Sequence, residues 1–396
     1  MVTTDIKQIN ELLIRGVENV YPTREFLEER LKSGERLTVY TGYDPTAPTL
    51  HIGHGITMLK LRQFQELGHN VIFLIGDFTG MIGDPTDKTA ARKKLTRKDV
   101  LFNCKLYQQQ ASAILDFGGE NPVEIRYNSE WLGKMTYANV LELSSLVTVP
   151  RLMERDMFQE RLKENKTIYL HELQYPLMQG YDSVAMDVDG EVGGNDQTFN
   201  MLVGRDLMKE LKHKEKFVIA MKLLVDPSGK KMGKTTGNMV ALSDAGEDMF
   251  GKVMSWGDDM ILLGFELCTR VPMKEIEKME KKMKAGENPR DFKLALAREI
   301  TGLFLGEDAA KRGEEFFGRV IQRSEIPKTM PELRPSAYDI VTVLVKAGLA
   351  GSKSEARRLI DENGVRVNDR IVETYDVVTK MGDVVQKGKR YFVRIL

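Results

Sequence analysis

Apolar and polar positions near the start of the chain change their spacing twice. Residues 36–43 are rich in β-branched and aromatic side chains, which predicts a strand, and a turn with two prolines ends it. From residue 51 onward the apolar residues fall near helical spacing, and residues 70–76 (NVIFLIG) form a continuous apolar run typical of a strand buried on both faces. Strand, helix and strand in this order predict a right-handed βαβ unit, and so an α/β fold with a parallel sheet.

A first candidate site lies where this strand meets the helix. His51, Gly53 and His54 (HIGH, 51–54) open the helix, and the two histidines project from the same side of it. Ligands bind at the carboxyl ends of strands in open α/β sheets, and exposed amides at a helix start favour anions. Because Gly53 has no side chain to block a flat ligand, the arrangement suits a triphosphate.

The same histidine pair could form half of a zinc site, or simply cap the helix. The chain has five histidines and two cysteines and lacks a Cys-x-x-Cys pair, so a closed structural zinc site has few candidate ligands. We therefore expect no tightly bound protein metal.

A basic stretch with a glycine lies at residues 225–235 (VDPSGKKMGKT). Gly233, Lys234 and Thr235 imitate the end of a P-loop, but that pattern requires glycine at position 228, where this chain has Ser228. The P-loop interpretation therefore fails. Taken alone, the stretch is more typical of a solvated lysine loop.

Residues 171–188 predict the most informative helix. Tyr175, Gln179 and Asp182 fall at positions i, i+4 and i+7, so three polar groups share one face, as in the wall of a pocket. A buried Asp182 needs a hydrogen-bond donor. The alternative is an amphipathic helix whose polar face lies in water. Pro176 removes a helical hydrogen bond, so the helix is expected to begin or kink there.

The loop after the second predicted strand is a further candidate, because loops at strand ends carry sites. Thr79 and Asp84 lie in this glycine-rich segment, although Asp-Pro is also common turn chemistry. A basic cluster that includes Lys88 and Arg92 follows. It is either a solvated helix start or a flap near phosphate.

Composition narrows the class of protein. The 396 residues, 42% of them apolar, allow two or three domains. The 58 basic and 58 acidic residues cancel, so any nucleic-acid binding must use local patches. Cys104 and Cys268 suggest no disulfide framework. The sequence has no signal-peptide core and no run of 18 apolar residues, which predicts a cytoplasmic protein without a membrane span.

The pair HIGH (51–54) and KMGKT (231–235) resembles the two signatures of class I aminoacyl-tRNA synthetases. The stretches YTGYDPTAPTLHIGH, LMQGYDS and GGNDQ are similar to those of bacterial tyrosyl-tRNA synthetases, and the resemblance covers nearly the whole chain. KMGKT differs from the often-quoted KMSKS at its third and fifth positions, where the family tolerates glycine and threonine. The roles of the two lysines are therefore retained.

The resemblance implies a Rossmann-like nucleotide-binding domain with a parallel sheet, then a helical domain and a small α+β RNA-binding domain. The expected boundaries are 1–245 for the catalytic domain, with a dimer-interface insertion near 130–170, 246–323 for a helical anticodon-side domain, 324–335 for a linker, and 336–396 for the RNA-binding module. That module resembles a fold shared with a small-subunit ribosomal protein. A homodimer is expected.

The resemblance also implies the reaction. L-tyrosine would be activated with ATP to tyrosyl-adenylate and pyrophosphate, and the tyrosyl group would then pass to the 3′ end of tRNA(Tyr). The substrate carboxylate itself attacks the α-phosphate, so catalysis rests on positioning and charge stabilisation. Mg²⁺ would arrive with ATP, because no dedicated carboxylate cage is visible in the sequence.

The site residues follow by resemblance. Contacts to the reacting nucleotide are expected from Thr46, His51, His54, Lys88, Arg92, Lys231, Lys234 and Thr235. Tyrosine would be bound by Tyr40, Asp84, Tyr175, Gln179, Asp182 and Gln197, and ATP by Asp44, Gly53, Thr57, Gly194, Asp196 and, again, Lys234. Tyr40 and Asp182 would both bond the phenol hydroxyl. Such a pocket rejects phenylalanine because its own polar atoms stay unpaired, a rule for which tyrosyl-tRNA synthetases are the standard example.

The C-terminal module is expected to bind RNA. Residues 336–396 carry eleven basic and eight acidic residues, a net charge of +3 that is weak by itself. The expectation that this module binds RNA rests instead on its resemblance to the RNA-binding fold. The side chains expected to contact RNA phosphates are Lys353, Arg357, Arg358 and Arg366.

Three alternatives stay open. A nucleotidyltransferase outside the synthetases could share the HIGH pattern but would not require the C-terminal extensions. A catalytically idle RNA-binding protein on a synthetase scaffold would lose motif lysines or the pocket, and all are present here. A tryptophanyl-tRNA synthetase is disfavoured by the pair Tyr40 and Asp182.

Overall fold

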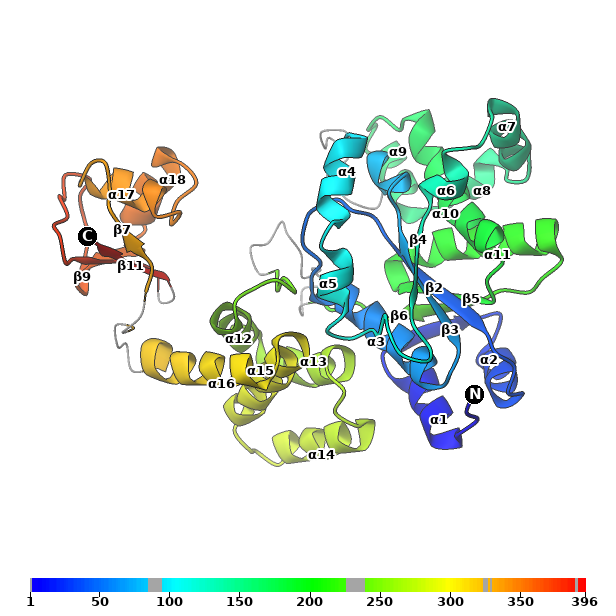
Figure 1. Ribbon diagram of the computed structural model, residues 1–396, viewed down its shortest axis with the longest axis horizontal. Helices are drawn as coiled ribbons and strands as arrows, with labels where there is room; N and C mark the ends of the chain where they lie inside the picture. The colour runs from blue at the N-terminus through cyan, green and yellow to red at the C-terminus, as the bar shows by residue number, and fades with distance from the viewer. Residues whose placement is uncertain (1, 85–94, 226–238, 323–326, 328–329, 389–390) are drawn as a thin grey trace. The chain divides into compact units, whose positions relative to one another are not determined.

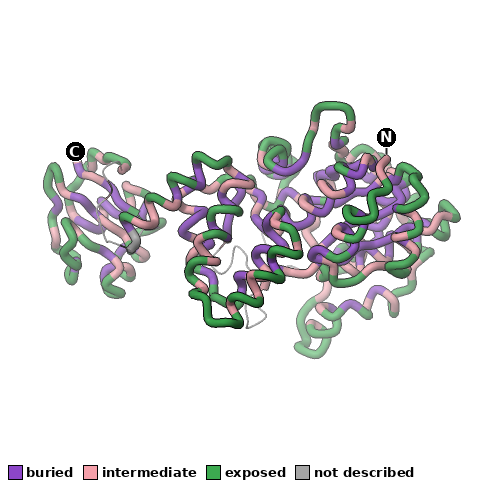
Figure 2. Tube along the Cα trace, turned by 90° about the horizontal axis from the view of Figure 1, so that it is seen from below, coloured by how far each residue is buried: buried purple, intermediate pink, exposed green. Residues whose placement is uncertain are grey.

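The computed structural model describes residues 2–84, 95–225, 239–322, 327, 330–388 and 391–396. They form two compact units, Met1–Asp244 with Trp256–Leu296, and Ala245–Ser255 with Ala297–Leu396. Each unit has its own sheet and its own buried residues (Figures 1 and 2). The domain boundaries expected near residues 245, 323 and 335 stay predictions.

A six-stranded sheet in the order β1-β6-β5-β2-β3-β4 is the centre of the first unit. Its strands are β1 (Val17–Tyr21), β2 (Thr38–Tyr43), β3 (Asn70–Ile75), β4 (Glu124–Tyr127), β5 (Gly190–Gly194) and β6 (Phe217–Met221). β1 is antiparallel to β6, and the other neighbours are parallel, which confirms the expected α/β fold. The chain order reverses at β2, between β3 and β5, and ligands bind at the carboxyl ends of strands beside such a point.

The two most apolar strands are covered on both faces. Every residue of β6 and all of β3 except Asn70 are buried. Parallel strands packed between layers have this composition, because no face is left for polar side chains. The sheet is therefore the hydrophobic core of the unit, as the apolar run at residues 70–76 predicted.

Helices surround this sheet and form the segment between β4 and β5 (Figure 1). They are α1 (Ile6–Ile14), α2 (Arg24–Lys32), α3 (Ile52–Glu66), α4 (Arg97–Cys104), α5 (Tyr107–Ala111), α6 (Ser129–Leu132), α7 (Tyr137–Ser145), α8 (Val149–Met153), α9 (Asp156–Lys163), α10 (Leu170–Met186) and α11 (Thr198–Lys212). Later in the chain, α13 (Ile261–Cys268) contacts α3, and α14 (Met273–Lys284) packs against α13. Short 3₁₀ turns lie at η1 (Thr79–Met81), η2 (Asn195–Gln197) and η4 (Asp258–Met260). α10 runs through Pro176, so the helix does not begin at the proline.

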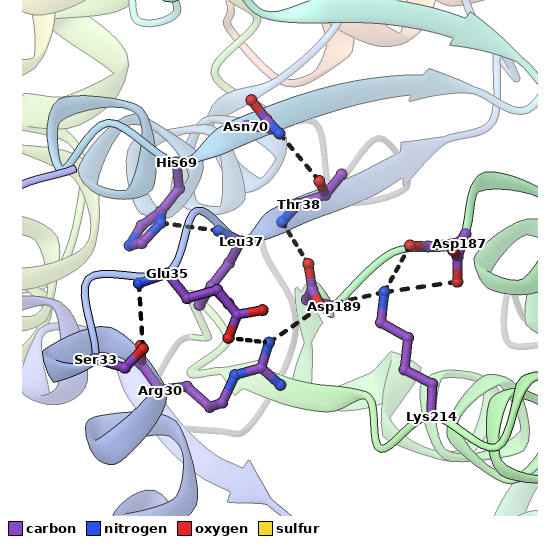
Figure 3. Close-up of polar contacts among 10 residues, drawn as sticks. All are labelled: Arg30, Ser33, Glu35, Leu37, Thr38, His69, Asn70, Asp187, Asp189 and Lys214. Carbon is purple, nitrogen blue, oxygen red and sulfur yellow. Dashed lines mark hydrogen bonds and ion pairs between the residues drawn. The ribbon is translucent and has the colours of Figure 1, made fainter. Parts of the chain in front are cut away.

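Charged side chains hold the amino ends of the strands together, at the edge of the sheet opposite the candidate site (Figure 3). Asp189, directly before β5, accepts hydrogen bonds from the Thr38 amide at 2.8 Å and from Arg30 Nη2 at 3.2 Å, and it pairs with Lys214 at 3.2 Å. Nδ1 of the buried His69 accepts from the Leu37 amide at 3.2 Å. The cluster therefore joins α2, β2, β5 and the segment after α11.

The second unit contains a helical part and a small sheet. The helical part comprises α12 (Gly246–Met254), the end of α15 (Pro289–Leu305), α16 (Glu307–Phe316) and a π-helical turn, η5 (Phe317–Gln322). The sheet has the order β7-β11-β10-β8-β9, with strands β7 (Glu332–Leu333), β8 (Val365–Val367), β9 (Arg370–Ile371), β10 (Val384–Lys387) and β11 (Tyr391–Ile395). Apolar side chains of α17 (Ile340–Lys346) and α18 (Lys353–Asp361) share one buried cluster with β8, β10 and β11.

Candidate active site

His51 and His54 shape the start of α3, at the carboxyl end of β2. Nδ1 of His51 accepts a hydrogen bond from the Gly53 amide, and Nδ1 of His54 accepts one from the His51 amide, each at 3.1 Å. The two rings stack with their centroids 3.8 Å apart. A neutral imidazole that accepts through Nδ1 carries its proton on Nε2, so both rings hold the tautomer that donates through Nε2. The helix start, whose amides favour anions, thus has two imidazole donors beside it.

Other expected nucleotide contacts lie at the same edge of the sheet. Thr46 is exposed in the turn after β2, whereas Thr57 is buried and its hydroxyl bonds that of Tyr43 at 2.9 Å. Gly194 ends β5, where a Cβ would lie only 2.5 Å from Oδ1 of Asp196. The chain therefore needs glycine at this position to bring the Asp196 carboxylate close to the strand end.

Asp44 sits at the centre of a group of hydroxyls. Tyr175 donates to Oδ2 of Asp44 at 2.8 Å, and Thr79 donates to Oδ1 at 2.7 Å. Burial raises the pKa of Asp44 to about 7, the two hydroxyls oppose that rise, and the charge of Asp84 adds to it. Asp44 therefore changes charge near neutral pH, at a place where an ammonium group could bind.

Asn200 connects the side chains of Gln179 and Gln197, and Gln197 in turn bonds Asp84. Oδ2 of Asp84 accepts from Gln197 Nε2 at 2.7 Å, and Asn200 Nδ2 donates to Gln197 Oε1 at 3.1 Å and to Gln179 Oε1 at 2.8 Å. Oδ1 of Asp84 pairs with Nη2 of Arg155 at 2.8 Å. Arg155 is only 4% exposed, and its Nε and Nη1 have no hydrogen-bond partner among the described residues.

Tyr40 and Asp182 are both buried, at 0% and 2% exposure. The hydroxyl of Tyr40 lies 2.9 Å from Ser183 Oγ. Asp182 accepts from Trp131 Nε1 at 2.8 Å and from Asn128 Nδ2 at 3.3 Å. Burial raises the pKa of Asp182 well above its usual range and, with the nearby carboxylates Glu191 and Asp182, raises that of Tyr40. The hydrogen-bond donors that a buried Asp182 needs are thus supplied by the protein itself, through an indole N–H and a side-chain amide.

The residues that sequence reasoning missed are mostly donors to the expected site residues. Asn128 follows β4 directly and could have been found as a polar residue at the carboxyl end of a parallel strand. Trp131 and Arg155 come from the segment between β4 and α10, where the sequence indicated only an insertion. Nothing in the local pattern relates them to Asp182 or Asp84.

Five expected site residues cannot be placed. Lys88, Arg92, Lys231, Lys234 and Thr235 lie outside the described residues. The expected RNA contacts are all described and exposed: Lys353, Arg357 and Arg358 lie on α18, and Arg366 lies on β8. The guanidinium of Arg357 lies 6.0 Å from the ring centroid of Tyr375.

Two features are absent from the described ranges of the chain. No group of three or more His, Cys, Asp or Glu side chains in this part of the chain could hold a metal ion. No helix among the same residues is long and apolar enough to cross a membrane.

The fold and the HIGH helix start define a class of protein, and comparison with known proteins agrees. Residues 32–322 match the family described as "tRNA synthetases class I (W and Y)", and residues 340–385 match the S4 domain. Among solved structures, the tyrosyl-tRNA synthetase of Archaeoglobus fulgidus complexed with L-tyrosine has a TM-score of 0.62 at 22% identity, with 78% of this chain and 100% of that chain covered. At this identity the likeness concerns the fold alone. The protein is a class I aminoacyl-tRNA synthetase.

Curated relatives narrow the class. The tyrosine–tRNA ligase of Thermotoga maritima is 45% identical over 390 residues, which cover 97% of this chain and 96% of the relative. That of Haemophilus influenzae is 43% identical over 395 residues, covering 99% and 98%. The chain belongs to the tyrosyl-tRNA synthetase family, and the expected enzyme class, an aminoacyl-tRNA ligase, is confirmed.

Proposed function

We propose that this protein activates L-tyrosine with ATP and then transfers the tyrosyl group to the 3′ end of tRNA(Tyr). One arrangement supports the choice of amino acid: the hydroxyl of Tyr40 and the carboxyl of Asp182 are both buried, and the hydroxyl of Tyr40 lies 2.9 Å from Oγ of Ser183, the residue that follows Asp182 in α10. A phenol hydroxyl can accept from one of these groups and donate to the other. Neither phenylalanine nor tryptophan has a hydroxyl for them.

The amino end of the substrate would be held by the carboxylates at the other end of the pocket. Asp44 and Asp84 lie near Tyr175, whose hydroxyl bonds Asp44. Gln179 and Gln197 adjoin them through Asn200. This set offers acceptors for an ammonium group and amide donors for the carboxylate. The position of the tyrosine would then be fixed at both ends, as an in-line reaction needs.

In the activation step a carboxylate oxygen of tyrosine forms a bond to the α-phosphorus of ATP, and the bond from that phosphorus to the pyrophosphate oxygen breaks. Negative charge then grows on the leaving pyrophosphate. His51, His54 and the start of α3 would stabilise the phosphates, with Thr46 beside them. Gly53, Thr57, Gly194 and Asp196 would bind the nucleoside part, while Asp44 holds the ammonium group.

The lysines and arginine of the two basic segments would complete this site. Lys88, Arg92, Lys231 and Lys234, with Thr235, are assigned to the pyrophosphate by resemblance alone. Lysine suits such a role as a point charge on a long, flexible stem. Mg²⁺ bound to ATP would neutralise further phosphate charge, and we propose no protein-held metal.

The tRNA would be bound partly by the S4 domain. Lys353, Arg357 and Arg358 stand on one helix, α18, and Arg366 lies on the neighbouring strand β8. Exposed lysines and arginines contact phosphates without reading sequence. We therefore assign them to the phosphate backbone of the tRNA rather than to its bases.

We further propose a cytoplasmic homodimer. Large apolar side chains are exposed on several helices of the first unit, among them Phe102 of α4, Tyr137 of α7, Val149 of α8 and Leu170 of α10. Exposed apolar side chains mark an interaction surface where they lie side by side. A second copy of the chain is the occupant that the family resemblance implies.

The function is tested by amino-acid-dependent exchange of pyrophosphate into ATP, with tyrosine, phenylalanine and tryptophan assayed in parallel and without tRNA. Exchange with tyrosine alone is the expected result. Exchange with tryptophan would move the specificity but keep the class, and no exchange with any of them would favour the catalytically idle RNA-binding protein.

A further inference from the structure

A buried ion pair lies next to residues of the proposed tyrosine pocket. Nζ of Lys216, directly before β6, is 2.5 Å from Oε2 of Glu191 on β5, and the two side chains are 0% and 3% exposed. An ion pair without access to water is a poor source of stability, since removing both charges from water costs about as much as their attraction returns. Its contacts are therefore more informative than its energy.

Both partners reach residues of the expected pocket. Lys216 Nζ also donates to Ser183 Oγ at 2.8 Å, and that oxygen lies 2.9 Å from the hydroxyl of Tyr40. The second oxygen of Glu191 accepts from Gln179 Nε2 at 3.2 Å. Lys216 is thus connected through Ser183 to Tyr40, at the phenol end of the expected pocket. Glu191 contacts Gln179 on the wall of the same pocket.

The two helices beside the pair are built to admit it. A Cβ on Gly204 of α11 would lie 2.7 Å from Lys216 Nζ and 3.1 Å from Ser183 Oγ. A Cβ on Gly180 of α10 would lie 3.0 Å from the Gly204 amide nitrogen. Glycine at both positions lets the helices approach closely while leaving room for the ammonium group.

The ammonium group constrains where the protons point. It can only donate, so it occupies a lone pair of Ser183 Oγ. A hydroxyl that already accepts from a cation is a stronger donor, which favours Ser183 donating its own proton to Tyr40. Tyr40 then keeps its own proton for an acceptor, which is the neighbouring Glu191 carboxylate in this structure and the oxygen of a substrate phenol when tyrosine binds. The opposite direction would leave Tyr40 with no proton for the substrate.

We infer that Lys216, with Glu191 and Ser183, is a positioning group that makes Tyr40 a hydrogen-bond donor toward the substrate hydroxyl and so helps to select tyrosine over phenylalanine. None of the three needs to touch the substrate. The inference rests on the proposed function, because it assumes that the amino acid bound between Tyr40 and Asp182 is tyrosine.

The test measures kcat/KM for tyrosine and for phenylalanine by pyrophosphate exchange in the full-length protein. Lys216→Met, which keeps the chain length and removes the charge, is expected to lower the tyrosine-to-phenylalanine ratio about tenfold, the usual size of one hydrogen bond to a charged group. Ser183→Ala is expected to lower it in the same direction by about threefold or more. KM for tyrosine should rise in both variants while KM for ATP stays unchanged.

Lys60→Met is the matched control. Lys60 is also a buried lysine of the first unit, and its Nζ donates to the carbonyl oxygen of Leu12, which is not a residue of the expected pocket. It should leave the ratio unchanged. A ratio within about twofold of the unaltered protein in the Ser183→Ala variant would overturn the inference even if Lys216→Met does not fold. An equal loss in Lys60→Met would overturn it too, whereas absence of tyrosine exchange in the unaltered protein would instead remove the proposed function.

Discussion

The hydroxyl of Tyr175 donates a 2.8 Å hydrogen bond to the carboxylate of Asp44, across a gap of 131 positions in the sequence. Tyr175 comes from the middle of α10 and Asp44 from the turn after β2. The bond favours the ionised form of Asp44, but burial outweighs it and raises the pKa to about 7. The charge of the proposed ammonium site is therefore set by pH within the physiological range.

Tyrosine binding should depend on pH through Asp44. Below pH 7 Asp44 is mostly protonated and neutral, and above it the carboxylate can pair with the ammonium group of the substrate. The Kd for tyrosine, measured calorimetrically without ATP, should fall about tenfold per pH unit between pH 5 and 6.5 and level off above pH 7.5. In Asp44→Asn this slope should disappear. A flat profile in the unaltered protein would contradict the assignment.

Asp182→Ala should abolish detectable use of tyrosine, because it removes the carboxyl group that bonds the substrate hydroxyl. A milder substitution tests whether the orientation of the Asp182 carboxyl group matters for tyrosine binding. Trp131→Phe keeps an aromatic ring but loses the indole N–H that donates to Asp182 at 2.8 Å, and KM for tyrosine should rise about tenfold with kcat less affected. An Asp182→Ala enzyme that still exchanges pyrophosphate with tyrosine would show that the pocket has been misplaced.

Arg155→Ala should destabilise the fold as well as the site. Its partner Asp84 would be left as a largely buried charge, with a side chain only 16% exposed, and breaking a pair of this kind costs about 3–5 kcal/mol. Urea denaturation measures the loss. Arg151→Ala is the control, since its pair with Glu154 is exposed and should contribute less than about 1 kcal/mol. Equal effects of the two variants would disprove the special role of Arg155.

Asp189→Ala should reduce stability without changing the chemistry. It would remove the side-chain acceptor of the Thr38 amide and one of the partners of Arg30 and of Lys214 at the amino ends of the strands (Figure 3). We expect a loss of about 2–4 kcal/mol in the free energy of unfolding, with unaltered KM values for tyrosine and ATP at low temperature. Glu35→Ala removes only an exposed partner of Arg30 and should cost less than about 1 kcal/mol. A changed KM in Asp189→Ala would mean that this cluster communicates with the site.

A chain ending at Arg334 should still form tyrosyl-adenylate but charge tRNA poorly. The truncation removes the S4 domain with α18 and its exposed basic residues and leaves the six-stranded sheet intact. The full-length double variant Arg357→Ala with Arg358→Ala tests the same surface more gently. Its aminoacylation should be weaker at low salt and should fall less steeply than that of the unaltered protein as salt is raised, because fewer phosphate contacts remain to release counterions. Unchanged charging by the truncated chain would remove the assigned RNA role.

Much of the fold could be predicted because its signals are local. The apolar run of β3 and the β-branched run of β2 are direct consequences of burial in a parallel sheet, and both were predicted from spacing. The start of α3 at His51 is likewise a local feature, since the cap is made by the histidines themselves. Pro176 shows the limit of local rules: it lies inside α10, where the packing of that helix against α11 outweighs one lost hydrogen bond.

By itself the sequence determined the family, the parallel α/β fold and the residues that stand at the strand ends, because motifs and periodicity are properties of neighbouring positions. Only the tertiary structure decided what those residues bond. Tyr40 meets Ser183 across 143 positions and Asp182 meets Trp131 across 51. Crossover connections bring the carboxyl ends of distant parallel strands to one edge of the sheet, and the partners of a buried polar group are fixed there by space rather than by order along the chain.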